Sequence, residues 1–132
     1  MADLGVERAD FIALPVQDLR RADEFYGKTL GLRRNPNSSD RWVEYELGNV
    51  TVALVSPEAM GPDFRAEGHQ LPIGLRVADV DEARVKLEAE GVEFLHGTID
   101  SGVCNLATFS DPDGNKLQLH RRYASYRDGS LP

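Results

Sequence analysis

The sequence has little cysteine and no long apolar run, and both shortages narrow the class of protein. Its 132 residues include one cysteine, Cys104, which cannot form an internal disulfide and fits a reducing compartment. The first residues, MADLGVERAD, lack the apolar core of a signal peptide. No apolar run approaches the length that spans a bilayer. We therefore expect a cytoplasmic protein with no membrane partner.

Basic residues are scarce relative to acidic ones. The chain carries 15 Lys and Arg against 22 Asp and Glu, a net charge of −7, and has no basic run. An acidic surface repels phosphate backbones, so nucleic acid is not an expected partner. Hydrophobic residues make up 41% and charged residues 28% of the chain, the balance of an ordinary globular protein. The length favours a single domain over residues 1–132.

Two segments of the chain follow the same pattern, which indicates an internal repeat. They cover residues 11–32 and 72–92. In each segment alternating apolar residues predict a strand, and an Asp (Asp18 or Asp79) then predicts a helix start. A glycine (Gly31 or Gly91) predicts the end of each helix.

Strand patterns follow each predicted helix. They form one hairpin from 41–47 and 50–55 and a second from 104–109 and 116–120, with a further short strand around 93–96. Each half is thus a strand, a helix and about three strands, so we expect an α+β fold of two βαβββ modules. The predicted parts are module 1 at about 9–55, a linker at 56–70, module 2 at about 71–123 and a tail at 124–132. The linker is either a solvated connection or a lid over a site.

One helix per half leaves one face of each predicted sheet uncovered. This open face mixes apolar and polar residues: Phe11, Ala13, Trp42, Glu44, Glu46, Thr51, Ala53, Pro72, Gly74, Arg76, Gln118 and His120. We expect the two sheets to curl into a shared cup, whose apolar walls and few polar groups are typical of a small-molecule site. A protein–protein interface is the alternative, because it is also mixed in polarity.

The candidate ligand-binding residues on the open face are Phe11, Trp42, Glu44, Ala53, Pro72, Arg76, Gln118 and His120. Four of these side chains allow a more specific interpretation. Trp42 stacks on a planar ligand or fills a subunit interface. Arg76 binds a carboxylate or phosphate, or else pairs with an acidic residue. Glu44 and His120 are the candidate acid and base, with a hydrogen-bonded structural role as the alternative for His120. Cys104 has no evident base beside it, so we do not expect a nucleophile there.

Three motifs follow one another along the chain: Val16-x-Asp18-Leu19-x-x-Ala22-x-x-Phe25-Tyr26, Leu30-Gly31-Leu32 and Asp111-Pro112-Asp113-Gly114-Asn115. Together with the repeat they resemble the vicinal oxygen chelate superfamily, which includes glyoxalase I, extradiol dioxygenases and bleomycin-resistance proteins. The resemblance implies a cup formed by two βαβββ modules. It also implies a homodimer.

Enzymes of that superfamily generally hold a divalent metal with one residue on the first and one on the last strand of each module. In this chain the resemblance places those positions at Phe11, Ala53, Pro72 and Gln118, of which only Gln118 has a side-chain oxygen. Phe, Ala and Pro side chains have no lone pair for a metal. We therefore expect neither a metal nor another cofactor.

The resemblance then favours a protein that binds and sequesters a small organic molecule, as bleomycin-resistance proteins do. The alternative is a lyase, isomerase or dioxygenase-type enzyme. Such an enzyme would use Glu44 and His120 directly, or a displaced metal site built from Glu44, Gln118 and His120.

Overall fold

A computed structural model describes residues 2–132 of the chain. The chain divides into two compact halves, with the boundary between Ala66 and Glu67. This boundary lies within the segment 56–70, which the sequence identifies as a linker. Each half has its own sheet and its own helix.

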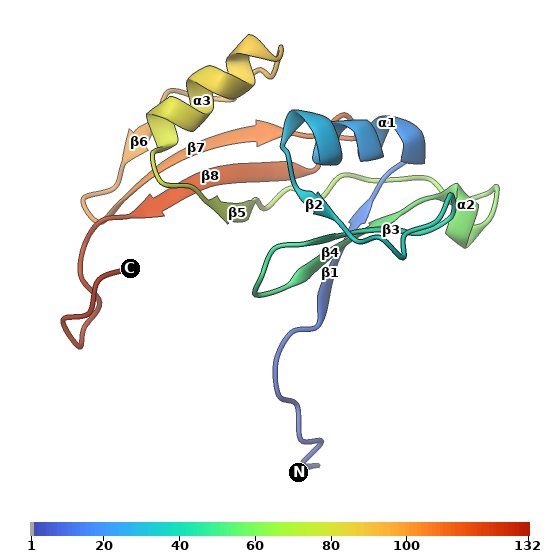
Figure 1. The fold of residues 1–132 in the computed structure, drawn as a ribbon, viewed down its shortest axis with the longest axis horizontal. Helices are drawn as coiled ribbons and strands as arrows, with labels where there is room; N and C mark the ends of the chain where they lie inside the picture. Colours follow the sequence, from blue (N-terminus) through green and yellow to red (C-terminus); the bar gives the residue numbers. More distant parts are fainter. Residues whose placement is uncertain (1) are drawn as a thin grey trace. The chain divides into compact units, whose positions relative to one another are not determined.

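The first half contains a four-stranded sheet with the strand order β1-β4-β3-β2 (Figure 1). Its elements are β1 (Phe11–Pro15), α1 (Leu19–Glu24), η1 (Phe25–Thr29), β2 (Arg33–Arg34), β3 (Val43–Glu46), β4 (Thr51–Val55) and α2 (Pro57–Met60). β1 runs parallel to β4, with Ala13 opposite Ala53. β3 runs antiparallel to β4, with Glu44 opposite Ala53, so that Ala13, Ala53 and Glu44 lie in one row across the sheet.

The second half contains a four-stranded sheet with the order β5-β8-β7-β6. Its elements are β5 (Ile73–Arg76), α3 (Val80–Ala89), β6 (Ile99–Asp100), β7 (Cys104–Ser110) and β8 (Lys116–Arg122). β5 runs parallel to β8, with Gly74 opposite Gln118, and β7 runs antiparallel to β8. Both halves therefore share one topology, which confirms the predicted α+β class with two βαβββ modules.

The residues predicted to begin the two helices cap them in the structure. The carboxylate of Asp18 accepts a hydrogen bond from the Arg21 amide at 3.0 Å, and that of Asp79 accepts one from the Glu82 amide at 2.9 Å. Each carboxylate thereby satisfies an amide that has no partner within its helix. Gly91 has a φ of +88° just after α3, a conformation that glycine adopts without steric cost.

The first helix ends in a way that the sequence pattern does not indicate. α1 continues into a π-helical segment, η1, in which the Leu30 amide donates to the Phe25 carbonyl at 2.9 Å. The bond spans one residue more than an α-helical bond and widens the turn. Gly31, with a φ of +70°, then reverses the chain toward β2.

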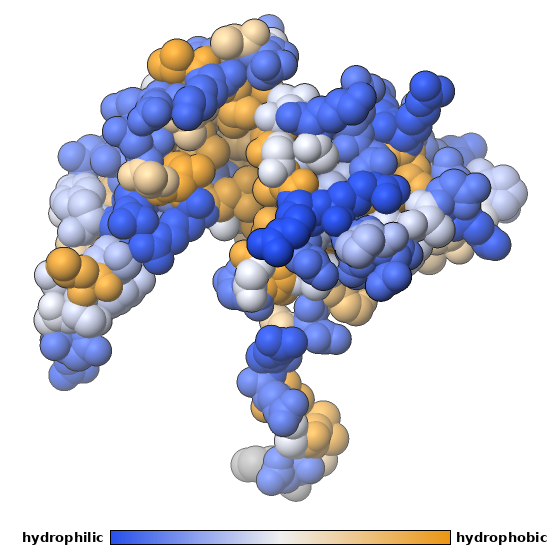
Figure 2. Space-filling view, viewed as in Figure 1, coloured by the Kyte–Doolittle hydropathy of each residue, from blue (hydrophilic) through white to orange (hydrophobic). Residues whose placement is uncertain are grey.

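Each helix packs on one face of its own sheet. In the first half Leu14, Tyr26, Tyr45 and Leu54 are fully buried, and in the second half Phe109, Leu117 and Leu119 are buried. Figure 1 shows α3 lying along β7 and β8, and Figure 2 shows hydrophobic residues beneath its hydrophilic outer surface. Among residues 2–132, no helix combines the length and apolar character that crossing a membrane requires.

Three strand predictions need correction. Residues 93–96 form no strand: Phe94 makes an isolated bridge to Phe109, and the His96 carbonyl accepts a hydrogen bond from Arg84 at 2.8 Å. The side chain of Arg84 in α3 thus bonds the carbonyl of His96. The strand therefore starts later in the chain, at β6. β2 went unpredicted since its two arginines are exposed and do not alternate with apolar residues. β3 is shorter than the predicted 41–47.

Candidate functional site

In the first half, the face of the sheet opposite the helix carries an exposed aromatic ring and a buried floor. Phe11 is 55% exposed, whereas Ala53 is 1% exposed in the central strand β4. Ala13 and Glu44 share this face because both lie opposite Ala53 in the sheet register. Ala53 is therefore part of the buried floor of this face. Phe11 and Glu44 are side chains of this face that a ligand can contact.

Trp42 and Glu44 form a hydrogen-bonded pair. The indole nitrogen of Trp42 donates to Oε1 of Glu44 at 2.6 Å, and both residues are half-buried. Trp42 precedes β3, because its backbone amide bonds the hydroxyl of Ser39 at 3.1 Å instead of joining the sheet. The bond fixes the indole plane and occupies one oxygen of Glu44, while the second oxygen is available to a donor on a ligand.

In the second half, Gln118 and His120 follow each other on the open face of β8. The amide nitrogen of Gln118 donates to the Thr108 hydroxyl at 3.1 Å, which leaves its carbonyl oxygen as an acceptor. His120 is half-buried and lies opposite Arg76 of β5. Within residues 67–132 the Arg76 side chain has no hydrogen bond or ion pair, so its guanidinium remains open to an anionic group.

Pro72 lies outside the sheet, one residue before β5. A proline has no amide proton to donate to a ladder, and it is tolerated at a strand entry for that reason. The register nevertheless makes it the counterpart of Phe11. Pro72 is two residues before Gly74, which faces Gln118, just as Phe11 is two residues before Ala13, which faces Ala53.

The donor set at the four superfamily positions does not fit a divalent metal. The side chains of Phe11, Ala53 and Pro72 offer no lone pair, and Gln118 offers one neutral amide oxygen. In the part of the chain that the structure describes, residues 2–132, no three His, Cys, Asp or Glu side chains cluster in a way that would hold a metal ion.

A second polar cluster lies under the first helix and was not found from the sequence. The hydroxyl of buried Tyr45 donates to the Asp23 carboxylate, and Arg34 bonds the same carboxylate at 3.2 Å. Burial and the bond to Asp23 raise the pKa of Tyr45 above its usual value. The alternation of β3 places Tyr45 on the helix side, but its partner is 22 residues away in the chain, so no local signal connects them.

Cys104 occupies a structural position. It is buried, and its sulfur lies 3.0 Å from the hydroxyl of Ser101, which also accepts the Cys104 amide. Neither the Ser101 hydroxyl nor a backbone amide acts as a base for the Cys104 thiol.

Comparison with known proteins places the whole pattern in one family. A model of the "Glyoxalase/Bleomycin resistance protein/Dioxygenase superfamily" matches residues 8–119. The chain is 31% identical to a lactoylglutathione lyase of Escherichia coli O157:H7 over 119 residues, which cover 80% of this chain and 86% of that protein.

Solved structures show the same likeness. TnmS3, an antibiotic binding protein from Streptomyces sp. CB03234, is 25% identical with a TM-score of 0.71, over 91% of this chain and 99% of that one. A superfamily member from Sphaerobacter thermophilus is 30% identical with a TM-score of 0.72, over 89% and 98%. The chain belongs to the glyoxalase/bleomycin resistance protein/dioxygenase superfamily.

Proposed function

We propose that this protein binds a small organic molecule on the open face of a sheet without a metal, as a sequestration or resistance protein does. The observation that carries the proposal is the residue set at the superfamily's metal positions. The sequence resemblance puts Phe11 and Ala53 at those positions in the first half and Pro72 and Gln118 in the second, and the matching registers of the two sheets support this assignment. A fold that keeps its topology while three of four donors are apolar supports binding through contact rather than chelation.

The side chains of the two faces suggest what such a ligand offers. The first face presents the ring of Phe11 and the Trp42–Glu44 pair, which suit a flat ring system with a hydrogen-bond donor. The second face presents the guanidinium of Arg76 and the carbonyl oxygen of Gln118, which suit an anionic or hydroxyl group. The likeness to an antibiotic binding protein supports an antibiotic as a class of ligand.

Metal analysis provides the first test. The protein is purified without chelators, and its Zn, Ni, Fe and Mn contents are measured by mass spectrometry. We expect less than stoichiometric metal and an unchanged melting temperature after EDTA treatment. Stoichiometric divalent metal that EDTA removes with loss of stability contradicts the metal-free proposal.

A thermal-shift screen of antibiotics and metabolites provides the second test. A ligand at a hundred times its Kd stabilises the fold by about 2.7 kcal/mol, which raises the melting temperature by several degrees. For a compound that does so, we expect Trp42→Ala to weaken affinity about tenfold or more where the ligand binds the first sheet, and Arg76→Gln to do so where it binds the second. Tyr126→Ala and Arg127→Gln are the matched controls, since both residues lie in the tail. Equal effects of all four variants contradict a site on the open faces.

The likeness to a lactoylglutathione lyase supports an enzyme as the second candidate. In such an enzyme without a metal, the free oxygen of Glu44 and the imidazole of His120 transfer the protons. Turnover of a glutathione hemithioacetal that survives EDTA and is lost in both Glu44→Gln and His120→Ala supports this candidate. Turnover that persists in both variants eliminates it.

A further inference from the structure

The carboxylate of Glu44 lies half-buried on the open face of the first sheet without a basic partner. Within residues 2–66 this side chain makes one hydrogen bond, which comes from the neutral indole nitrogen of Trp42, and no ion pair. Its backbone is held in place, because the Glu44 amide donates to the Ser38 hydroxyl at 3.0 Å and the Glu44 carbonyl accepts the Asn35 amide at 2.8 Å. A fixed carboxylate that has lost part of its hydration and gained no counter-charge favours an incoming cation.

The nearby arginines do not supply that cation. Arg34 is on the helix side, where its Nε bonds a carboxylate of α1 at 3.2 Å. Nε of Arg41 donates to a backbone carbonyl of α2 at 3.2 Å. Arg33 lies directly opposite Glu46, in the neighbouring row of the open face. The negative charge of Glu44 therefore has no counterpart among these three arginines.

Apolar surface that suits a ring lies on the same face. In the sheet register Glu44 shares one row with Ala53 and Ala13, across the adjacent strands β3, β4 and β1 (Figure 1). Two strand spacings place Ala13 about 10 Å from Glu44. Ala13 is exposed, and Phe11, the next residue of β1 on this face, is 55% exposed. With the indole of Trp42 at the carboxylate end, this span accommodates an aromatic ring with a short charged substituent.

The electrostatics of the chain and the aromatic rings favour the same sign of ligand. The chain has a net charge of −7, which attracts cations from a distance. A cation also gains energy over the face of a Trp or Phe ring within about 6 Å. The first face thus combines a carboxylate with two aromatic side chains, both of which favour a positive group.

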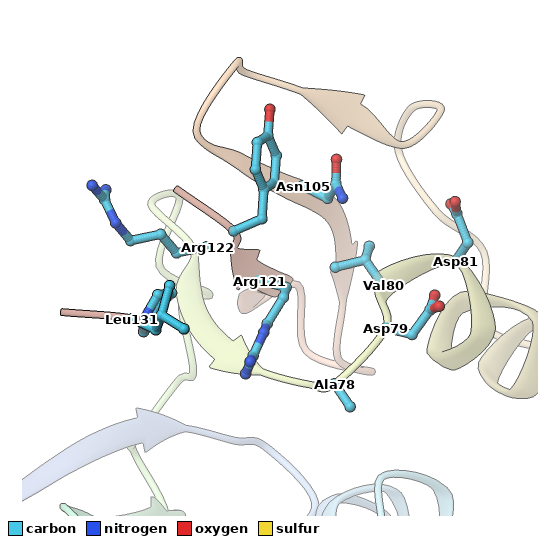
Figure 3. Close-up of a pocket in the computed structure, with 10 residues that line it drawn as sticks. Ala78, Asp79, Val80, Asp81, Asn105, Arg121, Arg122 and Leu131 are labelled. Atoms are coloured by element: carbon cyan, nitrogen blue, oxygen red, sulfur yellow. The ribbon is translucent and has the colours of Figure 1, made fainter. Parts of the chain in front are cut away.

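The cavity of the second half, about 490 Å³ in volume, does not combine its groups in this way (Figure 3). The guanidinium of Arg121 and the carboxylates of Asp79 and Asp81 line it, but they point away from one another. Val80 is 3% exposed and offers little surface to a ligand. The Trp42–Glu44 pair, in contrast, brings a charge and an aromatic ring into direct contact.

On the basis of the function proposed above, we propose that the ligand is a cationic aromatic molecule bound on the first sheet, and that Glu44 selects its charge. The positive group of the ligand donates a hydrogen bond to the second oxygen of Glu44. Its ring packs on the indole of Trp42 and on the surface formed by Phe11 and Ala13. Glu44 is thus the residue that determines specificity at this site.

The fluorescence of Trp42 tests the proposal, because Trp42 is the one tryptophan of the chain and lies in the site. Three probes of nearly the same shape differ in charge: benzamidine is a cation, benzamide is neutral and benzoate is an anion. In titrations of the full-length protein we expect a saturable change with benzamidine, at an affinity about tenfold or more above that for benzamide and benzoate. Equal or tighter binding of benzamide or benzoate overturns the proposal, as does the absence of a saturable change with all three.

A charge-removing variant tests the role of Glu44. Glu44→Gln keeps an oxygen that accepts the indole N–H of Trp42 but has no charge. We expect it to weaken benzamidine binding about tenfold or more and to leave benzamide binding unchanged. Glu24→Gln is the matched control, because it makes the same change at an exposed position of α1, on the helix side of the sheet. Unchanged benzamidine binding in Glu44→Gln, or an equal loss in Glu24→Gln, overturns the role of Glu44.

Further outcomes separate this proposal from the function on which it rests. Should Glu44→Gln not fold, the comparison of the three probes on the wild type decides the proposal. A neutral or anionic compound from the thermal-shift screen whose binding is weakened by Trp42→Ala keeps the proposed function and overturns the cationic class. Stoichiometric metal, in contrast, overturns the metal-free function, whereas tighter binding of benzamidine than of benzamide, lost in Glu44→Gln, supports the cationic class.

Discussion

Tyr45 connects the first sheet to its helix through a single hydroxyl. The side chain is fully buried, its hydroxyl donates to the Asp23 carboxylate, and Arg34 approaches the same carboxylate from β2. The bond joins α1 to β3, with Tyr45 fully buried and the Asp23 side chain 31% exposed. A hydrogen bond to a charged group contributes about 1.5–3 kcal/mol, and less where that group is partly exposed to water.

We predict that Tyr45→Phe lowers the free energy of unfolding by about 1–2 kcal/mol at neutral pH. The folded protein raises the pKa of Tyr45 above that of the unfolded chain, which is about 10. The associated stability is complete below that pH and is lost as the pH rises above it, because the unfolded phenol ionises first. Urea denaturation between pH 8 and pH 11 measures this loss.

The variant is expected to lose less stability over this range than the wild type, since it has no phenol to ionise at this position. Tyr126→Phe is the control, because Tyr126 is 47% exposed. Identical pH profiles of the wild type and Tyr45→Phe contradict the prediction.

At the level of elements, the residues that lead into the second sheet, Gly68 and His69, are held by hydrogen bonds and close packing. The His69 amide donates to the side-chain oxygen of Asn115 at 3.1 Å, and the His69 carbonyl accepts the Lys116 amide at 3.2 Å. These bonds extend the β5–β8 side of the sheet backward along the chain. A Cβ added at Gly68 would lie 2.5 Å from the Gly114 carbonyl carbon and 2.7 Å from the Asp113 oxygen.

Gly68→Ala is therefore expected to destabilise the protein by about 1–3 kcal/mol, because backbone atoms must move to admit the methyl group. Gly97→Ala is the matched control, since a Cβ there meets no atom within 4 Å and its φ is not positive. Thermal or urea denaturation of both variants measures the difference. A loss for Gly68→Ala no larger than that for Gly97→Ala would show that the hairpin loop yields easily.

Local sequence signals account for most elements and for less of the site. The alternation around Leu14 and Leu119 predicts strands and faces, and Asp18 and Asp79 predict helix starts, because each signal depends on neighbours in the chain. The exposed β2 has no such period. The hydrogen bond between Trp42 and Glu44 depends on side-chain conformations and cross-strand neighbours. Sequence spacing alone does not determine these.

At the scale of the whole molecule, the edge of the second sheet is a candidate contact between two copies of the chain. The segment around β6, the edge strand of the second sheet, carries three exposed apolar residues: Leu95 at 55%, Ile99 at 45% and Val103 at 44%. An apolar edge favours pairing with another chain. We infer that this edge contributes to a homodimer, the assembly that the sequence resemblance implies.

Light scattering at micromolar concentration is expected to give twice the chain mass of 14.6 kDa. Ile99→Lys should shift the equilibrium toward the monomer, because a charge on the edge strand disfavours strand addition. Val85→Lys, on the outer side of α3 and 66% exposed, is the control. A monomeric wild type refutes the dimer, and a dimer that persists in Ile99→Lys moves the interface elsewhere.

The parallel pairing of the first and last strands in each half sets the order in which a nascent chain matures on the ribosome. β5 has one neighbour in its sheet, β8, and β8 is the last strand of that sheet to be synthesised. The first sheet has all its strands once Val55 has emerged, whereas β5 must wait, unpaired, for Lys116–Arg122. Because a pairing this distant along the chain closes late, we expect the edge of β5 to remain open to chaperones until β8 has been synthesised.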